Sequence, residues 1–235
     1  MNNKTITWLA PDGDREWFPP LDQALEEPDG LLAAGGDLAP ARLLAAYRRG
    51  IFPWYSAGQP VLWWSPDPRE ILLPAEFKRS RSLAKSMRNR GFEIAFDRDF
   101  GAVVHACAAR REQSNGTWIT PEMHAAYSEL HARGHAHSVE VRLAGRLVGG
   151  LYGVLLGSVF FGESMFSRET DASKAALARL VDRGLVAGLT LIDCQLPTPH
   201  LRSLGSKPMN RREFSALVRA GTAVPDVPLF SDAGN

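Results

Sequence analysis

Residues 147–168 constrain the fold more than any other stretch of the chain. Leu147 to Val159 is dense in valine, leucine and glycine, which predicts buried strands joined by tight turns. The run ends near Glu163, and a carboxylate in such an apolar setting is costly to bury unless something pairs with it. We therefore expect Glu163 to be either half of an internal ion pair, with Arg168 as the obvious partner, or a ligand-facing acid at the end of a core strand.

The segments around this stretch predict an α+β domain. Alternating apolar and polar residues indicate strands, and a 3.6-residue period with capping residues indicates helices. The expected strands are 92–96, 138–143, 147–155, 158–161 and 189–195, and the expected helices are 100–111, 121–133, 171–186 and 209–221. Thr120 and Asn210 are the expected caps of the second and fourth helices, and Asp171 or Ser173 begins and Gly188 ends the third. Residues 197–206 are expected to form a loop. The order of helix, helix, three antiparallel strands, long helix and strand is typical of an acyltransferase-like domain, although fold order alone licenses no function.

A smaller N-terminal module precedes this domain. Residues 37–50 predict a helix, with Asp37 as its cap, Pro40 in its first turn and Gly50 at its end. The tryptophans that follow at 54, 63 and 64 are either a small aromatic core or a stacking surface for a nucleobase. Residues 66–68, Pro-Asp-Pro, resemble a hinge, so we expect domains at 1–68 and 69–235.

One helix predicted at residues 77–90 is strongly cationic. Arg81, Lys85 and Arg88 share one face, whereas Leu83 and Met87 share the opposite face. A solvated charged face is the usual explanation of such a pattern. Because no acidic residue interrupts residues 78–90, phosphate binding is favoured here. The formal charge of the whole chain, +1, excludes a globally basic nucleic-acid coat.

Other chemistries find little support in the sequence. Cys107 and Cys194 lack metal-site spacing, and the pair at 135 and 137, His-Ala-His, has no third ligand nearby, so no metal site is predicted. A nucleophilic Cys194 helped by His200 is weighed against a buried, inert thiol, which is favoured. No Walker-type loop is present, which predicts that ATP is not consumed and that no cofactor is needed.

The sequence also predicts the cellular location of the protein. We find no signal peptide and no apolar run long enough to cross a membrane, which predicts a cytoplasmic protein. Nothing demands a partner chain, so a monomer is expected.

Glu163 and the segment 193–195, Asp-Cys-Gln, both end apolar strands and are expected to line one cleft.

Six short motifs resemble those of the leucyl/phenylalanyl-tRNA–protein transferase family. In chain order they occupy residues 36–38 (GDL), 49–54 (RGIFPW), 62–66 (LWWSP), 116–120 (GTWIT), 162–167 (GESMFS) and 191–195 (LIDCQ). The resemblance covers about residues 28 to 206. It implies a small N-terminal domain and a C-terminal domain with an acetyltransferase-like (GNAT-type) mixed sheet and helices.

The resemblance also implies a reaction. Leu or Phe, and less often Met, would pass from aminoacyl-tRNA to the α-amino group of proteins with N-terminal Lys or Arg, which marks them for N-end-rule degradation. Trp54 and Trp118 would sandwich the terminal adenine, and the row Arg81, Lys85 and Arg88 fits the acceptor stem. Residues at the corresponding positions would form the pocket for the amino-acid side chain, although each could equally be plain core: Leu151, Phe160, Met165, Leu177 and Leu180.

The same resemblance assigns three catalytic roles. Asp193 would be the acid/base anchor, Gln195 the hydrogen-bonding relay to the attacking amine, and Glu163 the group that holds the amino end of the acceptor. Two other classes of function remain open at this point. One is an N-acetyltransferase that uses acetyl-CoA, although the expected glycine-rich pyrophosphate loop is missing. The other is a non-catalytic RNA-binding module, supported only by Trp54, Trp118 and the cationic helix.

Overall fold

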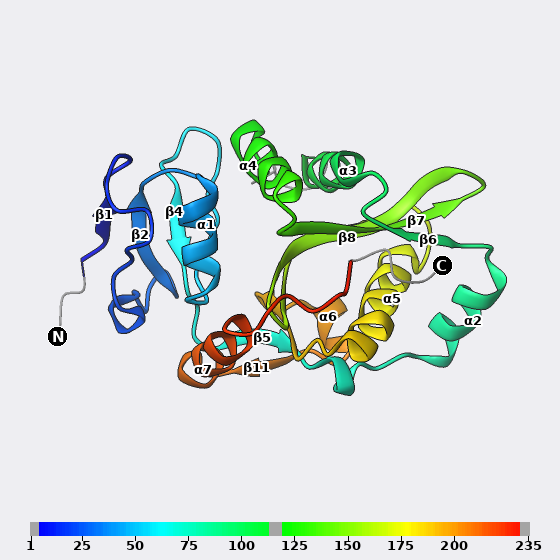
Figure 1. Ribbon diagram of the computed structural model, residues 1–235. Helices are drawn as coiled ribbons and strands as arrows, with labels where there is room; N and C mark the ends of the chain where they lie inside the picture. Colours follow the sequence, from blue (N-terminus) through cyan, green and yellow to red (C-terminus); the bar gives the residue numbers. More distant parts are fainter. Residues whose placement is uncertain (1–4, 113–118, 231–235) are drawn as a thin grey trace.

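The strands form two sheets. The computed structural model describes residues 5–112 and 119–230, and within them one sheet has four strands and the other has seven (Figure 1). The first has the order β1-β2-β4-β3 and consists of β1 (Thr7–Leu9), β2 (Leu31–Gly35), β3 (Phe52–Pro53) and β4 (Leu62–Trp64). The second has the order β11-β5-β10-β9-β8-β7-β6 and consists of β5 (Arg69–Leu72), β6 (Glu93–Phe96), β7 (Ala136–Leu143), β8 (Arg146–Leu156), β9 (Val159–Ser167), β10 (Leu191–Gln195) and β11 (Lys207–Met209).

Helices cover both faces of the larger sheet, as Figure 1 shows. The described α-helices are α1 (Pro40–Tyr47), α2 (Arg81–Asn89), α3 (Phe100–Glu112), α4 (Pro121–Ala132), α5 (Ala172–Ala187), α6 (Pro199–Ser203) and α7 (Arg211–Thr222). Helices α3 and α4 lie on one face, and α5 packs along β7 and β8 on the other, with α2 beside it. The predicted α+β class, a mixed sheet with helices, is confirmed.

Alternation along the central strands divides the core into two clusters. Tyr152 and Val154 of β8 pack with residues of α3, α4 and α7, whereas Leu151 and Leu155 of the same strand pack with α5. Successive side chains of a strand point to opposite faces, so one strand serves both clusters. The first cluster also contains residues of α1 and the small sheet, so the two sheets share one core. The domain division at residue 68 stays a prediction.

Capping residues were predicted well at three of the helices. Thr120 caps α4, Asn210 caps α7, and Asp171 and Gly188 flank α5, all as expected. Asp37 is an exception, because the N-cap of α1 is Ala39 and makes no side-chain capping bond. The Asp37 carboxylate instead accepts the Ala39 N–H at 3.1 Å, while it also pairs with two arginine side chains, Arg15 and Arg42.

Two segments differ from the predicted elements. The cationic helix begins at Arg81 rather than at residue 77, because Ser80 caps it and residues 77–80 are not helical. The loop predicted at residues 197–206 contains the short helix α6, which Thr198 caps and Pro199 opens. Proline in the first turn of a helix costs no hydrogen bond, and this favours the short helix.

Strand β9 is longer than predicted and separates from its neighbour part-way along. Strands β9 and β10 run parallel and pair only over Val159–Phe161 and Leu191–Asp193. Beyond that point the pairing of β10 with β5 shifts register between Asp193 and Gln195, while β9 continues to Ser167 beside β8. The two strand segments therefore part, and the space between them is the site described below.

No helix in the described residues has both the length and the apolar composition that a membrane span requires.

Candidate active site

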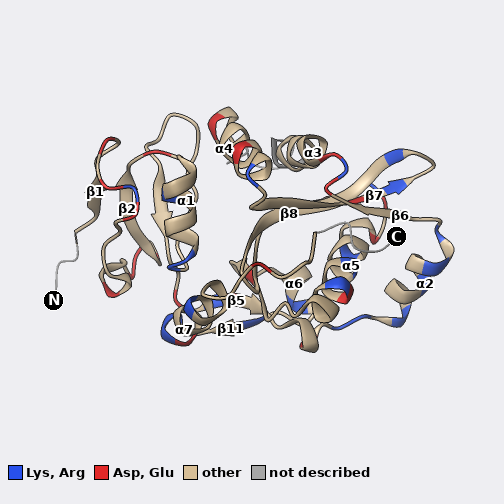
Figure 2. Cartoon of the chain, in the orientation of Figure 1, with Lys and Arg blue, Asp and Glu red and all other residues tan. Residues whose placement is uncertain are grey.

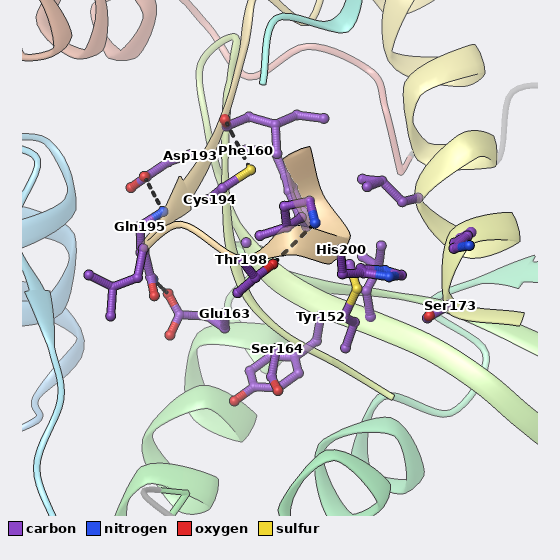
Figure 3. Close-up of a pocket in the computed structure, with 18 of the residues that line it drawn as sticks. Tyr152, Phe160, Glu163, Ser164, Ser173, Asp193, Cys194, Gln195, Thr198 and His200 are labelled. Carbon is purple, nitrogen blue, oxygen red and sulfur yellow. Dashed lines mark hydrogen bonds between the residues drawn. The ribbon is translucent and has the colours of Figure 1, made fainter. Parts of the chain in front are cut away.

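A cavity of about 720 Å³ opens where β9 and β10 part (Figure 3). Strands β8, β9 and β10 and helices α5 and α6 supply most of its wall, and residues 52–54 of the N-terminal part complete it. This volume suits a small-molecule-sized ligand. One part of the wall is polar and contains Tyr152, Glu163 and Gln195, whereas another is apolar.

Glu163 lies in the middle of β9, not at a strand end, and its partner is not Arg168. The carboxylate is 5% exposed and accepts three hydrogen bonds. Tyr47 donates at 2.8 Å, Tyr127 at 2.7 Å and the Gln195 amide at 3.0 Å. Arg168 instead donates to the Leu147 carbonyl. Arg168 was the wrong partner to expect because β9 extends to Ser167. Residue 168 therefore follows the end of the strand and is exposed.

Glu163 and the two tyrosines form a closed triangle of oxygen contacts. The Tyr47 and Tyr127 hydroxyls also contact each other, so three contacts join three groups. An ionised Glu163 leaves only two hydroxyl protons for these three contacts, whereas a protonated Glu163 supplies the third. Burial, and to a smaller extent the charge of Asp193, raises the pKa of Glu163 to about 7, whereas the tyrosine and amide donors limit the rise.

Both tyrosines stay neutral beside this carboxyl. Burial, and then the charge of Glu163, raises the pKa of each phenol well above its usual value. Tyr47 comes from the end of α1 and Tyr127 from α4, so the triangle joins the N-terminal part to the larger sheet. A carboxyl with a pKa near neutrality is suited to hold or release a proton close to pH 7.

Asp193 is a buried member of the cavity wall. It is wholly buried, and Arg69 binds it through both oxygens, from Nε at 2.8 Å and from Nη2 at 2.7 Å. The Oδ1 atom also accepts the backbone N–H of Gln195 at 2.9 Å. Through this contact and the Gln195 side chain, the three residues predicted to be catalytic, Glu163, Asp193 and Gln195, belong to one connected network.

The apolar part of the wall contains four of the five residues predicted to bind the amino-acid side chain. These four are Leu151, Phe160, Met165 and Leu177. The fifth, Leu180, is not among the residues of the wall and is wholly buried in the core between α5 and the sheet. It follows Leu177 by nearly one helical turn, which carries it about 5 Å along the axis away from the cavity.

The tryptophans of the N-terminal part serve two purposes. Trp63 is wholly buried, and its indole N–H donates to the Gly35 carbonyl, so it is a core residue. Trp54 lies on the cavity wall, is 40% exposed and meets Trp64 edge-on. One indole is therefore available for stacking at the cavity. Trp118, its predicted partner, lies outside the described residues.

The predicted cationic row is exposed on α2. Leu83 of this helix is buried against the core, and Arg81, Lys85 and Arg88 face solvent. Among the described residues these three cations form no ion pair. Ser86 donates to Asp171, a cavity residue at the start of α5, at 2.7 Å. Figure 2 shows the cations of α2, and the bond from Ser86 to Asp171 fixes this helix beside one side of the cavity.

Cys194 has the properties of an inert thiol. Although it contributes to the cavity wall, burial and the neighbouring Asp193 raise the pKa of the thiol far above its usual value. The thiol, not the thiolate, is therefore the form present, which argues against a nucleophilic role. No group of three or more residues that could bind a metal occurs in the described part of the chain.

Sequence reasoning missed Tyr47, Tyr127 and Arg69. The two tyrosines lie in predicted helices, where an aromatic residue at a buried position looks like core packing. A buried phenol requires a hydrogen-bond partner, and this requirement is the one signal that could have pointed to Glu163. Arg69 follows Pro68 at the predicted hinge, and nothing in the local pattern indicates that it is buried.

Comparison with solved structures gives weak similarities. A ribosomal-protein-alanine N-acetyltransferase from Brucella melitensis biovar Abortus 2308 has a TM-score of 0.37 and 17% identity, over 46% of this chain and 82% of that chain. L-PGS from Bacillus licheniformis has a TM-score of 0.41 and 11% identity, over 72% of this chain and 54% of that chain. TM-scores this low support no conclusion about the chemistry of this chain.

Comparison of sequences is far more informative. A protein named leucyl/phenylalanyl-tRNA–protein transferase from Pseudomonas entomophila is 60% identical to this chain, over 89% of this chain and 92% of that protein. The one from Azotobacter vinelandii is 61% identical, over 84% of this chain and 88% of that protein. The family model "Leucyl/phenylalanyl-tRNA protein transferase" matches residues 71–219, and the model of its N-terminal domain matches residues 36–67. The chain therefore belongs to the leucyl/phenylalanyl-tRNA–protein transferase family.

Proposed function

We propose that the protein transfers Leu or Phe, and Met less readily, from aminoacyl-tRNA to the α-amino group of proteins with N-terminal Lys or Arg. The observation that carries this proposal is the single cavity in which a half-exposed indole, a hydrogen-bonded carboxyl and an apolar wall meet. The 60% identity to proteins named for this transfer supports the same reaction. Tagging of the acceptor for N-end-rule degradation in the cytoplasm, by a monomer, is part of the proposal.

The bond changes are those of ester aminolysis. The acceptor nitrogen attacks the carbonyl carbon of the aminoacyl ester, an amide bond forms, and the bond to the ribose oxygen breaks. The nitrogen loses one proton, and the ribose oxygen gains one. An α-amine with a pKa of about 8 is already partly neutral at pH 7, so positioning of the two substrates supplies most of the rate.

The cavity offers a place for each part of the donor. The adenine stacks on Trp54, with Trp118 proposed for its other face, and stacking is worth about 1–3 kcal/mol for any base. The side chain of Leu or Phe occupies the apolar wall of Leu151, Phe160, Met165 and Leu177. Such a wall rejects charged side chains strongly and separates Leu from Met weakly, because small apolar differences are worth about 1–3 kcal/mol.

The polar wall receives the acceptor. Glu163, whose pKa is about 7, holds the attacking amine and is placed to take its proton, with the Gln195 amide beside it. Asp193 acts as the anchor of Gln195, because it is wholly buried, Arg69 binds both of its oxygens and its Oδ1 accepts the Gln195 N–H. The phosphates of the acceptor stem bind the row Arg81, Lys85 and Arg88.

One assay tests this reaction against both alternatives. Radiolabelled leucyl-tRNA is mixed with the protein and a peptide that begins with Arg, and a peptide that begins with Asp serves as the control. Label on the Arg peptide alone supports the proposal. Binding of the tRNA without labelling of the peptide supports an RNA-binding module. Labelling of the peptide only in a parallel reaction with radiolabelled acetyl-CoA supports an N-acetyltransferase.

A further inference from the structure

Arg69 is a buried arginine that does not belong to the cavity wall. It begins β5, is wholly buried, and forms the two-point contact with Asp193 described above. A guanidinium bound through two nitrogens fixes the plane of the carboxylate as well as its position. The direction in which Asp193 Oδ1 accepts the Gln195 N–H is therefore set by Arg69.

Two distant parts of the chain fix Arg69 in turn. The ring of Phe52, from β3 of the small sheet, lies 4.5 Å from the guanidinium carbon, and the ring of Phe214, from α7, lies 4.7 Å from it. Stacking on two aromatic rings holds the guanidinium in one plane. Phe52 also lines the cavity, so this stack joins the cavity wall to the network behind it.

The arrangement is poorly explained by stability alone. The Nη1 atom of Arg69 is buried and has no hydrogen-bond partner in the described part of the chain. Replacing a buried ion pair by well-packed apolar residues is often neutral or stabilising. A pair that also leaves one nitrogen unsatisfied is therefore better explained by a role in holding Asp193 in position.

Gln195 is the residue whose position depends on this pair. Its φ is +63°, in the left-handed region that residues other than glycine rarely adopt, and it follows the register shift of β10. A strained conformation persists only where its surroundings enforce it. Here the bond from the Gln195 N–H to Asp193 enforces it, and the side chain then reaches Glu163 at 3.0 Å.

We infer that Arg69 is a positioning residue for aminoacyl transfer, which orients Asp193 so that Asp193 holds Gln195 in its left-handed turn against Glu163. The inference rests on the proposed function, because its effect is measured as a rate of aminoacyl transfer. It predicts a defect in kcat with little change in KM, because Arg69 touches neither substrate.

Steady-state transfer with two variants tests the inference. In Arg69→Met, and less severely in Arg69→Lys, which keeps the charge but loses the two-point contact, kcat falls about 10- to 100-fold, as expected for a displaced active-site group. The KM values for leucyl-tRNA and for the Arg peptide stay within about twofold. The double variant Arg69→Met/Asp193→Asn is no slower than the worse single variant, since residues that act as a unit are not additive.

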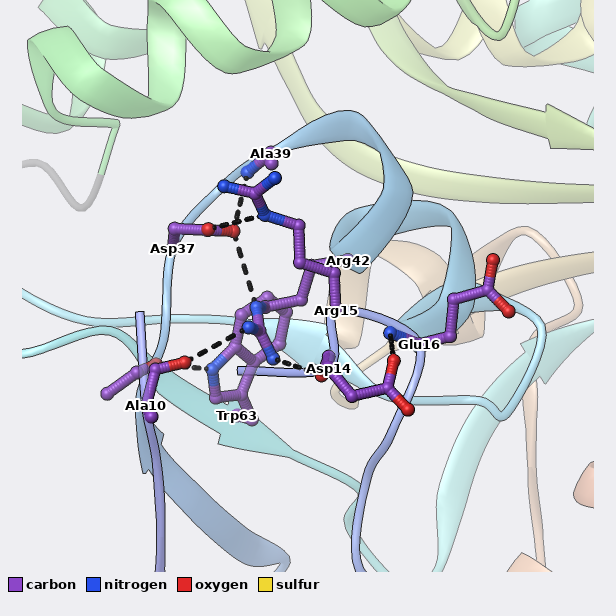
Figure 4. Close-up of polar contacts among 9 residues, drawn as sticks. Ala10, Asp14, Arg15, Glu16, Asp37, Ala39, Arg42 and Trp63 are labelled. Carbon is purple, nitrogen blue, oxygen red and sulfur yellow. Dashed lines mark hydrogen bonds and ion pairs between the residues drawn. The ribbon is translucent and has the colours of Figure 1, made fainter. Parts of the chain in front are cut away.

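Arg42 provides a matched control for loss of a buried arginine. It is 1% exposed, pairs with Asp37 and donates to the carbonyls of Ala10 and Asp14, and none of these residues lines the cavity (Figure 4). Arg42→Lys is expected to lower Tm by as much as Arg69→Lys does, without changing kcat. A folded Arg69 variant with the parent kcat, a defect confined to KM, or an additive double variant would overturn the inference.

A crystal structure of Arg69→Met separates failure of this inference from failure of the proposed function. The expected result is that Gln195 leaves the left-handed region and that its amide loses the contact with Glu163. This readout holds even if the parent protein transfers no aminoacyl group. An unchanged Gln195 in that structure would contradict the positioning role whatever the activity.

Discussion

Glu163 combines burial with three hydrogen-bond donors, and this combination sets its behaviour with pH. In an unfolded chain its pKa is near 4.5, and in the folded protein it is about 7. Below about pH 4.5 both states hold the proton, and as pH rises toward 7 the unfolded state loses it first. The contribution of Glu163 to stability is therefore complete at low pH and is lost as pH rises through this window.

Glu163→Gln, which resembles the protonated acid, is expected to remove this dependence. Between about pH 4.5 and 7 the free energy of unfolding of the parent should fall relative to that of the variant by up to roughly 3 kcal/mol, the equivalent of the pKa shift. Urea denaturation at several pH values measures both curves. Curves that stay parallel across the window would contradict a raised pKa.

Tyr47→Phe is expected to move the same titration upward. The Tyr47 hydroxyl donates to the carboxylate, which favours the charged form, so its loss raises the pKa of Glu163 above about 7. Carbon-13 NMR of the glutamate carboxyls follows this pKa directly. Tyr55→Phe is the matched control, because the Tyr55 hydroxyl contacts Thr120 and not Glu163, and it should leave the titration where it is.

At the scale of elements, α5 offers a matched pair of leucines. Leu177 lines the cavity, whereas Leu180 of the same helix is buried in the core. Leu177→Ala enlarges the apolar wall and is expected to lower leucyl transfer relative to phenylalanyl transfer. Leu180→Ala is expected to destabilise the fold by about 2–5 kcal/mol with the Leu-to-Phe ratio unchanged. Competition between the two charged tRNAs gives the ratio, and equal effects of both variants on it would count against the assigned pocket.

Helix α2 is expected to act through charge alone. Removing Arg81, Lys85 and Arg88 together should weaken tRNA binding and reduce the slope of log K against log salt by about 2–3, since each phosphate contact contributes about 0.7–0.9. Filter binding at several salt concentrations measures the slope. Arg133→Ala removes a cation that Glu129 already neutralises, so it should change the slope little. An unchanged slope in the triple variant would show that RNA does not contact α2.

For the whole molecule, charge is distributed unevenly. Residues 5–37 contain eight acidic residues and one arginine, whereas α2 and α7 carry clusters of cations (Figure 2). Acidic surface repels phosphate, so this distribution favours placing the body of the tRNA over the C-terminal part. In the proposed complex the terminal adenine then reaches back to Trp54, which lies on the cavity wall in the N-terminal part.

Local sequence patterns predicted the central strands and helices well, but they did not predict the contacts between residues far apart in the sequence. Strands near 138–161 and the caps Thr120 and Asn210 follow from alternation and capping chemistry, which are local. The motifs also brought Glu163 and Gln195 together correctly. Arg69 and Tyr47 join segments more than a hundred residues apart, and neither spacing nor periodicity encodes such a meeting. Helix α6 was missed because five residues carry too little periodicity to register.

The most direct test of the account is a crystal structure with an adenosine that carries phenylalanine through a stable amide link. The central claim is that one cavity, where β9 and β10 part, receives the adenine and the amino-acid side chain together. The account predicts the adenine against Trp54, the phenyl ring among Leu151, Phe160, Met165 and Leu177, and the α-carbonyl beside Glu163 and Gln195. An adenine bound away from Trp54, or a phenyl ring outside that apolar wall, would contradict it.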